Sequence, residues 1–225
     1  MSTKINKNTI KCVVFDLDGT LLNTIKTINY YLNIALKMNG AKAVTEKECL
    51  DFVGYGAKRL IECALRNSDS YSAEMLTKVL KDYNSVYNAD PYYLTEVYGG
   101  ILDSLEALRE QGISLAVLSN KPDFAVREVV SRFLPDIFSY VGGAKDGVPL
   151  KPCPDSLIAI LSELGFSRDE AVYVGDSEVD VETARNANMP CISVSWGFRT
   201  AEQLKEAGAT HLATTPSEMT TIILK

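Results

Sequence analysis

Two carboxylates follow an apolar run near the start of the chain. Asp16 and Asp18 come directly after Cys12–Phe15 and are followed by Gly19 and Thr20. Residues two apart in an extended strand point to the same side, so the two carboxylates would lie close together, where repulsion opposes ionising both. A cation, a shared proton or solvent must relieve that repulsion. An Asp-rich turn that only ends a strand is the simpler interpretation, and residues farther along decide between the two.

The pattern of an apolar strand followed by polar groups occurs twice more. After residues 172–174 comes Asp176, with Asp180 about one helical turn farther on if a helix begins there. After residues 115–118 comes the pair Ser119-Asn120, whose hydroxyl and amide suit phosphate oxygens. Open parallel sheets bind ligands at the carboxyl ends of their strands. All these polar groups are therefore predicted to converge on one crevice.

Lys151 is predicted to lie in a rigid turn, because Pro152 and Pro154 forbid a continuous helix there. Such a turn holds the ammonium group in place. One held ammonium, four carboxylates, a hydroxyl and an amide at successive strand ends suit a hard divalent cation together with a phosphoryl group.

These motifs resemble those of the haloacid dehalogenase superfamily, and within it the phosphoglycolate phosphatase-like branch. The four motifs are residues 16–20, Ser119, Lys151, and residues 175–177 with Asp180. Any one of them is a weak signal, but four in this order, each at a predicted strand end or in a rigid turn, are specific. The likeness covers nearly the whole chain. It implies a Mg²⁺-dependent phosphatase acting on a small phosphorylated metabolite such as phosphoglycolate.

The resemblance also implies a role for each motif residue. Asp16 would be the nucleophile that forms an aspartyl phosphate, and Asp18 would protonate the leaving alkoxide and then deprotonate water. Asp16, Asp176 and the backbone carbonyl of Asp18 would hold Mg²⁺. Asp180 would orient Lys151 or a metal-bound water. The phosphoryl oxygens would be bound by Ser119 and Lys151, with Thr20 and Asn120 as secondary candidates.

After residue 98, apolar strands and amphipathic helices alternate. The expected helices are 99–111, about 122–133, 155–164 and 179–187, and the expected strands lie near 115–118, 138–141, 172–174 and 191–194. With the strand before Asp16, this alternation predicts an α/β fold with a doubly wound parallel, Rossmann-like sheet.

Residues 24–92 break the alternation and read as helices only, at 25–38, 46–52, 57–66 and 73–88. We predict a core domain of residues 1–22 and 93–225 and a helical cap domain of residues 23–92, inserted after the first strand. In the family that the chain resembles, such a cap closes over the core and selects the substrate. Lys58 is the cap residue expected to contact a substrate carboxylate. The alternative is a solvated lysine at a helix start.

The composition favours an intracellular enzyme. The 225 residues include 23 Lys+Arg and 29 Asp+Glu, a net charge of −6, which argues against nonspecific nucleic-acid binding. The five cysteines contain no close pair and read as reduced thiols. The polar, basic N-terminus lacks a run long enough for a signal peptide or membrane span. We expect a cytoplasmic monomer or homodimer whose partner is a small phosphorylated metabolite, with no nucleic acid and no membrane.

The sequence leaves other functions open. A pyrophosphatase, nucleotidase or sugar-phosphate phosphatase of the same superfamily would use the same core, which contacts only the phosphoryl group. A Mg²⁺-binding phospho-acceptor regulatory module also uses Asp residues at a sheet end, but has no reason to carry a large helical insertion. The single histidine, His211, reads as a partly buried strand residue, which leaves acid–base work to carboxylates. Arg199 reads as a surface cation.

Overall fold

The computed structural model describes residues 10–225, which form two compact units. The core unit contains the described residues up to Asn23 together with Val97–Lys225, and the helical unit is Thr24–Glu96. The helical unit therefore begins one residue later and ends four residues later than the segment 23–92 expected from the sequence. Two short strands, β2 and β3, pair with each other as a two-stranded sheet, at Leu22–Asn23 and Glu96–Val97.

The core unit is built on a six-stranded sheet in the order β5-β4-β1-β6-β7-β8, and each neighbouring pair is parallel. In chain order, these strands are β1 (Cys12–Phe15), β4 (Ser114–Pro122), β5 (Tyr140–Ala144), β6 (Ala171–Gly175), β7 (Cys191–Val194) and β8 (His211–Ala213). Phe15 of β1 lies opposite Val117 of β4 and Val174 of β6. Residues that follow these three strands therefore emerge at the same edge of the sheet.

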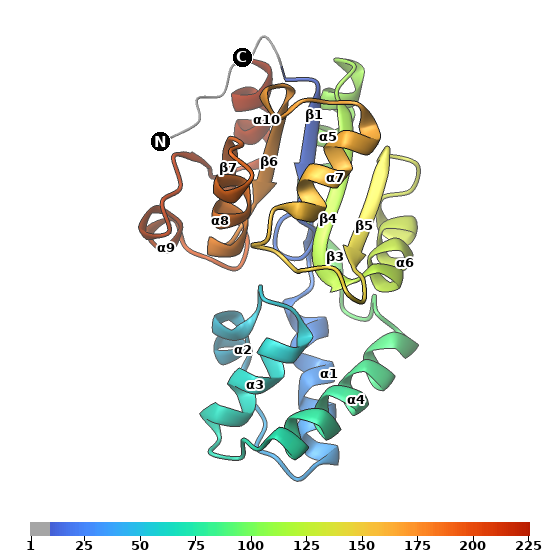
Figure 1. The fold of residues 1–225 in the computed structure, drawn as a ribbon, viewed down its shortest axis with the longest axis vertical. Coiled ribbons are helices and arrows are strands. Elements are labelled where there is room, and N and C mark those ends of the chain that lie inside the picture. Colours follow the sequence, from blue (N-terminus) through green and yellow to red (C-terminus); the bar gives the residue numbers. More distant parts are fainter. Residues whose placement is uncertain (1–9) are drawn as a thin grey trace. The chain divides into compact units, whose positions relative to one another are not determined.

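Helices cover both faces of this sheet. They are α5 (Ile101–Glu110), α6 (Asp123–Phe133), α7 (Asp155–Leu164), α8 (Glu178–Asn186), α9 (Ala201–Glu206) and α10 (Pro216–Leu224), with a 3₁₀ turn at Arg168–Glu170. Cys12 and Val14 of β1 pack in one apolar cluster with residues of α7 and α8, which lie in front of the sheet in Figure 1. Val13 and Phe15 point the other way and are equally buried. Burial on both faces is typical of parallel sheets, and the predicted α/β doubly wound fold is confirmed.

The structure differs from the predicted elements at a few places. The strand expected at 138–141 lies at Tyr140–Ala144. The helices α9 and α10 had no counterpart in the prediction, whereas His211 is half-buried at the start of β8, as predicted. Strand β4 continues to Pro122, so Ser119 and Asn120 lie inside the strand instead of after it. Its register against β5 shifts between Leu118 and Pro122.

The helical unit consists of α1 (Ile25–Met38), α2 (Glu46–Phe52), α3 (Ala57–Asn67) and α4 (Ala73–Ala89). Thr45 caps α2 with a capping box, and the Ser72 side chain accepts from the Met75 N–H at the start of α4. Buried tyrosines, among them Tyr31 on α1 and Tyr87 on α4, meet edge to face with ring centroids 5.6 Å apart. The helices expected from the sequence are thus present within a residue or so of their predicted ends. None of the helices formed by residues 10–225 has the length and apolar character needed to cross a membrane.

Candidate active site

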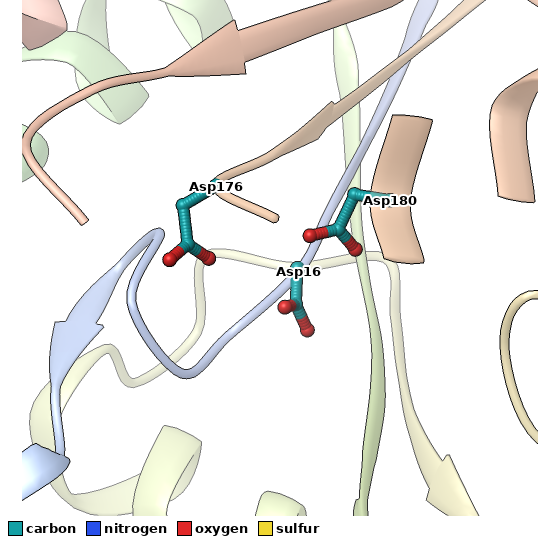
Figure 2. A group of neighbouring side chains, drawn as sticks. All are labelled: Asp16, Asp176 and Asp180. Atoms are coloured by element: carbon teal, nitrogen blue, oxygen red, sulfur yellow. The ribbon is translucent and has the colours of Figure 1, made fainter. Parts of the chain in front are cut away.

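Three buried carboxyl groups come together at the carboxyl edge of the sheet (Figure 2). Asp16 directly follows β1, Asp176 directly follows β6, and Asp180 lies in the first turn of α8. One carboxylate oxygen from each lies within 4.8 Å of the others. Their exposed fractions are 8%, 1% and 0%. Since water does not screen them, their repulsion requires positive charge nearby.

Lys151 supplies one such charge. Its Nζ lies 2.8 Å from Asp16 Oδ1 and 2.8 Å from Asp180 Oδ1, and it donates a hydrogen bond to the hydroxyl of Tyr173 at 3.0 Å. The backbone of Lys151 is held by Asn120, whose Nδ2 donates to the Lys151 carbonyl (3.0 Å) and whose Oδ1 accepts from the Lys151 N–H (2.8 Å). Lys151 is thus held as the sequence predicted, but by the amide of Asn120, which was expected to bind phosphate.

The pKa values of the cluster reflect burial first and the charges of neighbouring groups second. Burial raises the pKa of Asp16 to about 7, the charge of Lys151 opposes this rise, and Asp180 adds to it. Burial, then the charges of Asp180 and Asp16, hold the pKa of Asp176 well above its usual range. Burial alone would lower the pKa of Lys151, but the charges of Asp16 and Asp180 outweigh it and raise that pKa. One ammonium does not neutralise three carboxylates, so the site favours a further cation.

Asp176 is held by the loop after β1 and by the segment after β7. Thr20 Oγ1 donates to its Oδ1 (3.1 Å), and the Phe198 N–H donates to its Oδ2 (2.7 Å). A Cβ atom on Gly197 would lie 2.3 Å from the Gly19 carbonyl oxygen and 2.4 Å from Asp176 Cβ, so only glycine fits. Thr20 is completely buried and orients Asp176. Binding of phosphate by the Thr20 hydroxyl stays a prediction.

The segment 196–199 contains two further contacts that sequence reasoning missed. Trp196 Nε1 donates to the Thr20 carbonyl at 3.0 Å. Arg199 is 8% exposed and forms a bidentate pair with Glu178, with Nε and Nη2 at 2.8 and 3.0 Å from the two carboxylate oxygens. The prediction of a surface cation at Arg199 is therefore wrong, because Glu178, the first residue of α8, provides a charged partner that offsets the cost of burying the guanidinium.

Asp180 uses both of its carboxylate oxygens within the protein. Its Oδ2 accepts from the N–H and the hydroxyl of Ser177, at 3.1 and 2.6 Å, which closes the first turn of α8. Its Oδ1 pairs with Lys151. These contacts agree with the predicted role of orienting Lys151.

Asp18 is paired with a residue that the sequence analysis did not select. Lys121 Nζ lies 2.8 Å from Asp18 Oδ1. Within β4, the Lys121 N–H donates to Ser119 Oγ at 3.2 Å, so Lys121 also contacts Ser119. Lys121 directly follows the predicted pair Ser119-Asn120, and this position was the only feature of the sequence that could have indicated a role for Lys121 in the site.

The residues present fit a divalent cation bound by oxygen. Asp16 Oδ1 is buried and makes no hydrogen bond of acceptable geometry, although the Lys151 ammonium is near it. Each oxygen of Asp176 accepts one hydrogen bond and retains a lone pair. Hard carboxylate oxygens with excess negative charge are the ligands that Mg²⁺ prefers.

Comparison with known proteins agrees with this geometry. A model of the family described as "Haloacid dehalogenase-like hydrolase" matches residues 13–194. A phosphoglycolate phosphatase from Cereibacter sphaeroides is 35% identical over 195 residues, 84% of this chain and 87% of the relative. One from Aliivibrio fischeri is 29% identical over 203 residues, 88% and 89% of the two chains. A crystal structure from Lactobacillus delbrueckii subsp. bulgaricus matches with a TM-score of 0.92 and 33% identity, covering 96% of this chain and 99% of that one.

A parallel sheet with its acidic groups and buried lysine at the carboxyl edge is the architecture of a hydrolase core of this class. The family match spans most of the chain, which therefore belongs to the haloacid dehalogenase-like hydrolases. Within them it lies in the phosphoglycolate phosphatase-like branch, and it is a phosphatase.

Proposed function

We propose that the chain is a Mg²⁺-dependent phosphatase that hydrolyses a small phosphorylated metabolite, such as phosphoglycolate, through an aspartyl phosphate on Asp16. The observation that carries the proposal is the buried cluster of Asp16, Asp176 and Asp180 around a single lysine. Relatives named phosphoglycolate phosphatase, which cover most of this chain, support the choice of substrate class. The thiols of all five cysteines are free, which supports our proposal of a cytoplasmic enzyme.

In this proposal Asp16 attacks phosphorus. A carboxylate oxygen of Asp16 forms the new P–O bond while the bond to the leaving oxygen breaks, which divides hydrolysis into two displacements. The ammonium of Lys151, 2.8 Å from Asp16, offsets the negative charge of the transferring group. The Ser119 hydroxyl would donate to a phosphoryl oxygen. Its own oxygen accepts from the Lys121 N–H, which leaves the hydroxyl proton for that contact.

Asp18 transfers the proton in both displacements. In the first it protonates the leaving alkoxide, and in the second, as the conjugate base, it takes a proton from the attacking water. Mg²⁺ would be held by the side chains of Asp16 and Asp176 and by the backbone carbonyl of Asp18, and it would reduce the repulsion between the anionic nucleophile and the anionic phosphate. Thr20 and the Phe198 N–H fix Asp176 in both displacements.

Removing divalent metal should abolish the activity. We expect the purified protein, assayed with Mg²⁺ against a panel of phosphorylated metabolites, to prefer a small alkyl phosphate, and excess chelator to remove the activity on every substrate. The panel should contain phosphoglycolate, pyrophosphate, nucleoside monophosphates and sugar phosphates, with kcat/KM for each. Mg²⁺ should also raise the thermal midpoint of the metal-free protein, because it binds only the folded cluster.

Two results would contradict this proposal. Equal rates with and without chelator would exclude the metal. A phosphoryl group that is accepted and retained on Asp16 without turnover would indicate a regulatory module in place of an enzyme. The exposed variant Asp103→Asn, in the first turn of α5, is the control for nonspecific effects of losing a carboxylate.

Lys58 remains our candidate for contacting the leaving group. It is exposed in the first turn of α3, which begins after Gly56. If the substrate carries a carboxylate, Lys58→Ala should remove a charge-assisted contact and lower kcat/KM roughly tenfold to hundredfold. The rate on p-nitrophenyl phosphate, which lacks the carboxylate, should change much less. The neighbouring Arg59→Ala is the control. Unchanged rates on both substrates would make Lys58 a solvated lysine without a role in selection.

A further inference from the structure

A second buried ion pair between lysine and aspartate lies beside that of Lys151. Lys121 Nζ is 2.8 Å from Asp18 Oδ1, and the two side chains are 4% and 18% exposed. Lys151 Nζ is 2.8 Å from Asp16 Oδ1, with side chains 2% and 11% exposed. The two aspartates that follow β1 therefore each have their own lysine. Lys121 comes from β4, on one side of β1 in the sheet, whereas Lys151 comes from the turn before α7.

The backbone that carries Lys121 is held on one side by a hydrogen bond and closely packed on the other. Its N–H donates to Ser119 Oγ at 3.2 Å. Its carbonyl oxygen faces Gly143 of β5, where an added Cβ atom would lie only 2.4 Å from that oxygen. Strand β5 can approach β4 this closely only because residue 143 is glycine. The ammonium group of Lys121 therefore reaches Asp18 from a fixed point in the sheet.

Stability is a poor explanation for this pair. Taking an ammonium and a carboxylate out of water is costly, and buried ion pairs often contribute no more to stability than apolar side chains of the same size. A short charge-assisted hydrogen bond does provide orientation. The terminal torsion of an aspartate is otherwise soft, and the rate of a proton transfer depends on how well the donor is aligned with the acceptor.

We propose that Lys121 is a positioning residue that holds Asp18 in the orientation needed for proton transfer to the leaving group. The inference rests on the proposed function, in which Asp18 is that proton donor. In the step concerned, an oxygen of Asp16 bonds to phosphorus, the bond from phosphorus to the leaving oxygen breaks, and the proton of Asp18 passes to that oxygen. Lys121 forms no covalent bond and acts only through Asp18.

Lys121→Met should therefore slow the hydrolysis of a substrate more strongly when its leaving group needs a proton. An alkoxide must be protonated as it leaves, whereas p-nitrophenolate is stable as an anion. We expect kcat/KM for the best alkyl phosphate of the panel to fall about tenfold to hundredfold, because kcat/KM reports the first displacement, in which the alkoxide leaves. For p-nitrophenyl phosphate we expect kcat/KM to fall less than about threefold. Lys121→Gln, which keeps a hydrogen-bond donor, should show the same selectivity with a smaller loss.

A double-mutant cycle with Asp18→Asn completes the test. In the Asp18→Asn background, Lys121→Met should cause almost no further loss on the alkyl phosphate, because the group it positions is gone. Lys11→Met is the control, since Lys11 also pairs with a carboxylate, Glu170, at 2.7 Å, but on the surface of the core unit. It should behave as wild type on both substrates.

Three results would overturn the inference. Equal losses on both substrates would mean that Lys121 binds the phosphoryl group or supports the fold, and full additivity in the cycle would mean that it acts independently of Asp18. If Asp18→Asn is selective and Lys121→Met is not, the inference fails while the role of Asp18 stands. If Asp18→Asn lowers kcat/KM equally on both substrates, the proposed role of Asp18 as proton donor fails and the inference fails with it. Lys121→Gln allows the same comparisons if Lys121→Met does not fold.

Discussion

Asp16→Asn should lower kcat/KM by about 10⁴-fold or more on every substrate, because the amide is a far weaker nucleophile than the carboxylate. The fold should be retained, since the substitution is nearly isosteric. We expect the thermal midpoint of metal-free Asp16→Asn to equal or exceed that of wild type. Burial raises the pKa of Asp16 to about 7, so the ionised carboxylate is poorly accommodated at neutral pH.

Trapping distinguishes the nucleophile from the proton donor. Asp18→Asn should still accept a phosphoryl group from p-nitrophenyl phosphate, but should release it slowly because no base activates water. Acid-quenched peptide mass spectrometry should find phosphate on the peptide that contains Asp16 in Asp18→Asn and none in Asp16→Asn. Phosphate on any other residue would contradict the assignment of Asp16. Asp103→Asn should match wild type in rate and show no accumulation.

Lys151→Met should be the most damaging single change to stability at the site. It leaves Asp16 and Asp180 buried without their shared ammonium, and removing one partner of a buried ion pair typically costs about 3–5 kcal/mol. Activity should also be lost, since the transferring phosphoryl group loses its nearest cation. Urea unfolding of the metal-free protein, compared with Lys11→Met, gives the change in the free energy of unfolding.

The cost of Lys151→Met should increase with pH. The pKa of Asp16 in the folded protein, about 7, lies above its ordinary value of 3.8. The folded state therefore holds a proton that the unfolded state has released, and stability falls as the pH rises towards the folded pKa. Lys151 lowers that pKa, so in Lys151→Met the fall continues to higher pH. We expect a larger difference from wild type at about pH 8.5 than at about pH 6. A difference that is constant or shrinks with pH would contradict this account.

Much of the core could be predicted from the sequence because parallel sheets follow a simple rule. Buried strands read as continuous apolar runs, and their carboxyl ends share one edge. The positions of Asp16 and Asp176 after two such runs, and of Lys151 between prolines, were therefore visible in the sequence. The structure brings these groups together around β1, with Asp180 one turn into α8.

The hydrogen-bond partners could not be predicted in the same way. Thr20 and Asn120, both predicted to bind phosphate, also have partners that the sequence did not indicate: their side chains hold Asp176 and the backbone of Lys151. Either residue type can serve either role, and contacts over a few tenths of an ångström decide between them. Nothing in the sequence indicated that the Tyr173 hydroxyl would contact Lys151, because tyrosine is a common residue in strands.

The sequence by itself determined where the apolar strands of this phosphatase lie, and so which groups can reach one edge of its sheet, because an apolar run is a local property of the sequence. Only the tertiary structure decided which lysine serves which aspartate and that segment 196–199 holds Asp176. The pair of Lys121 with Asp18 joins residues 103 positions apart, and no period in the sequence encodes such a contact.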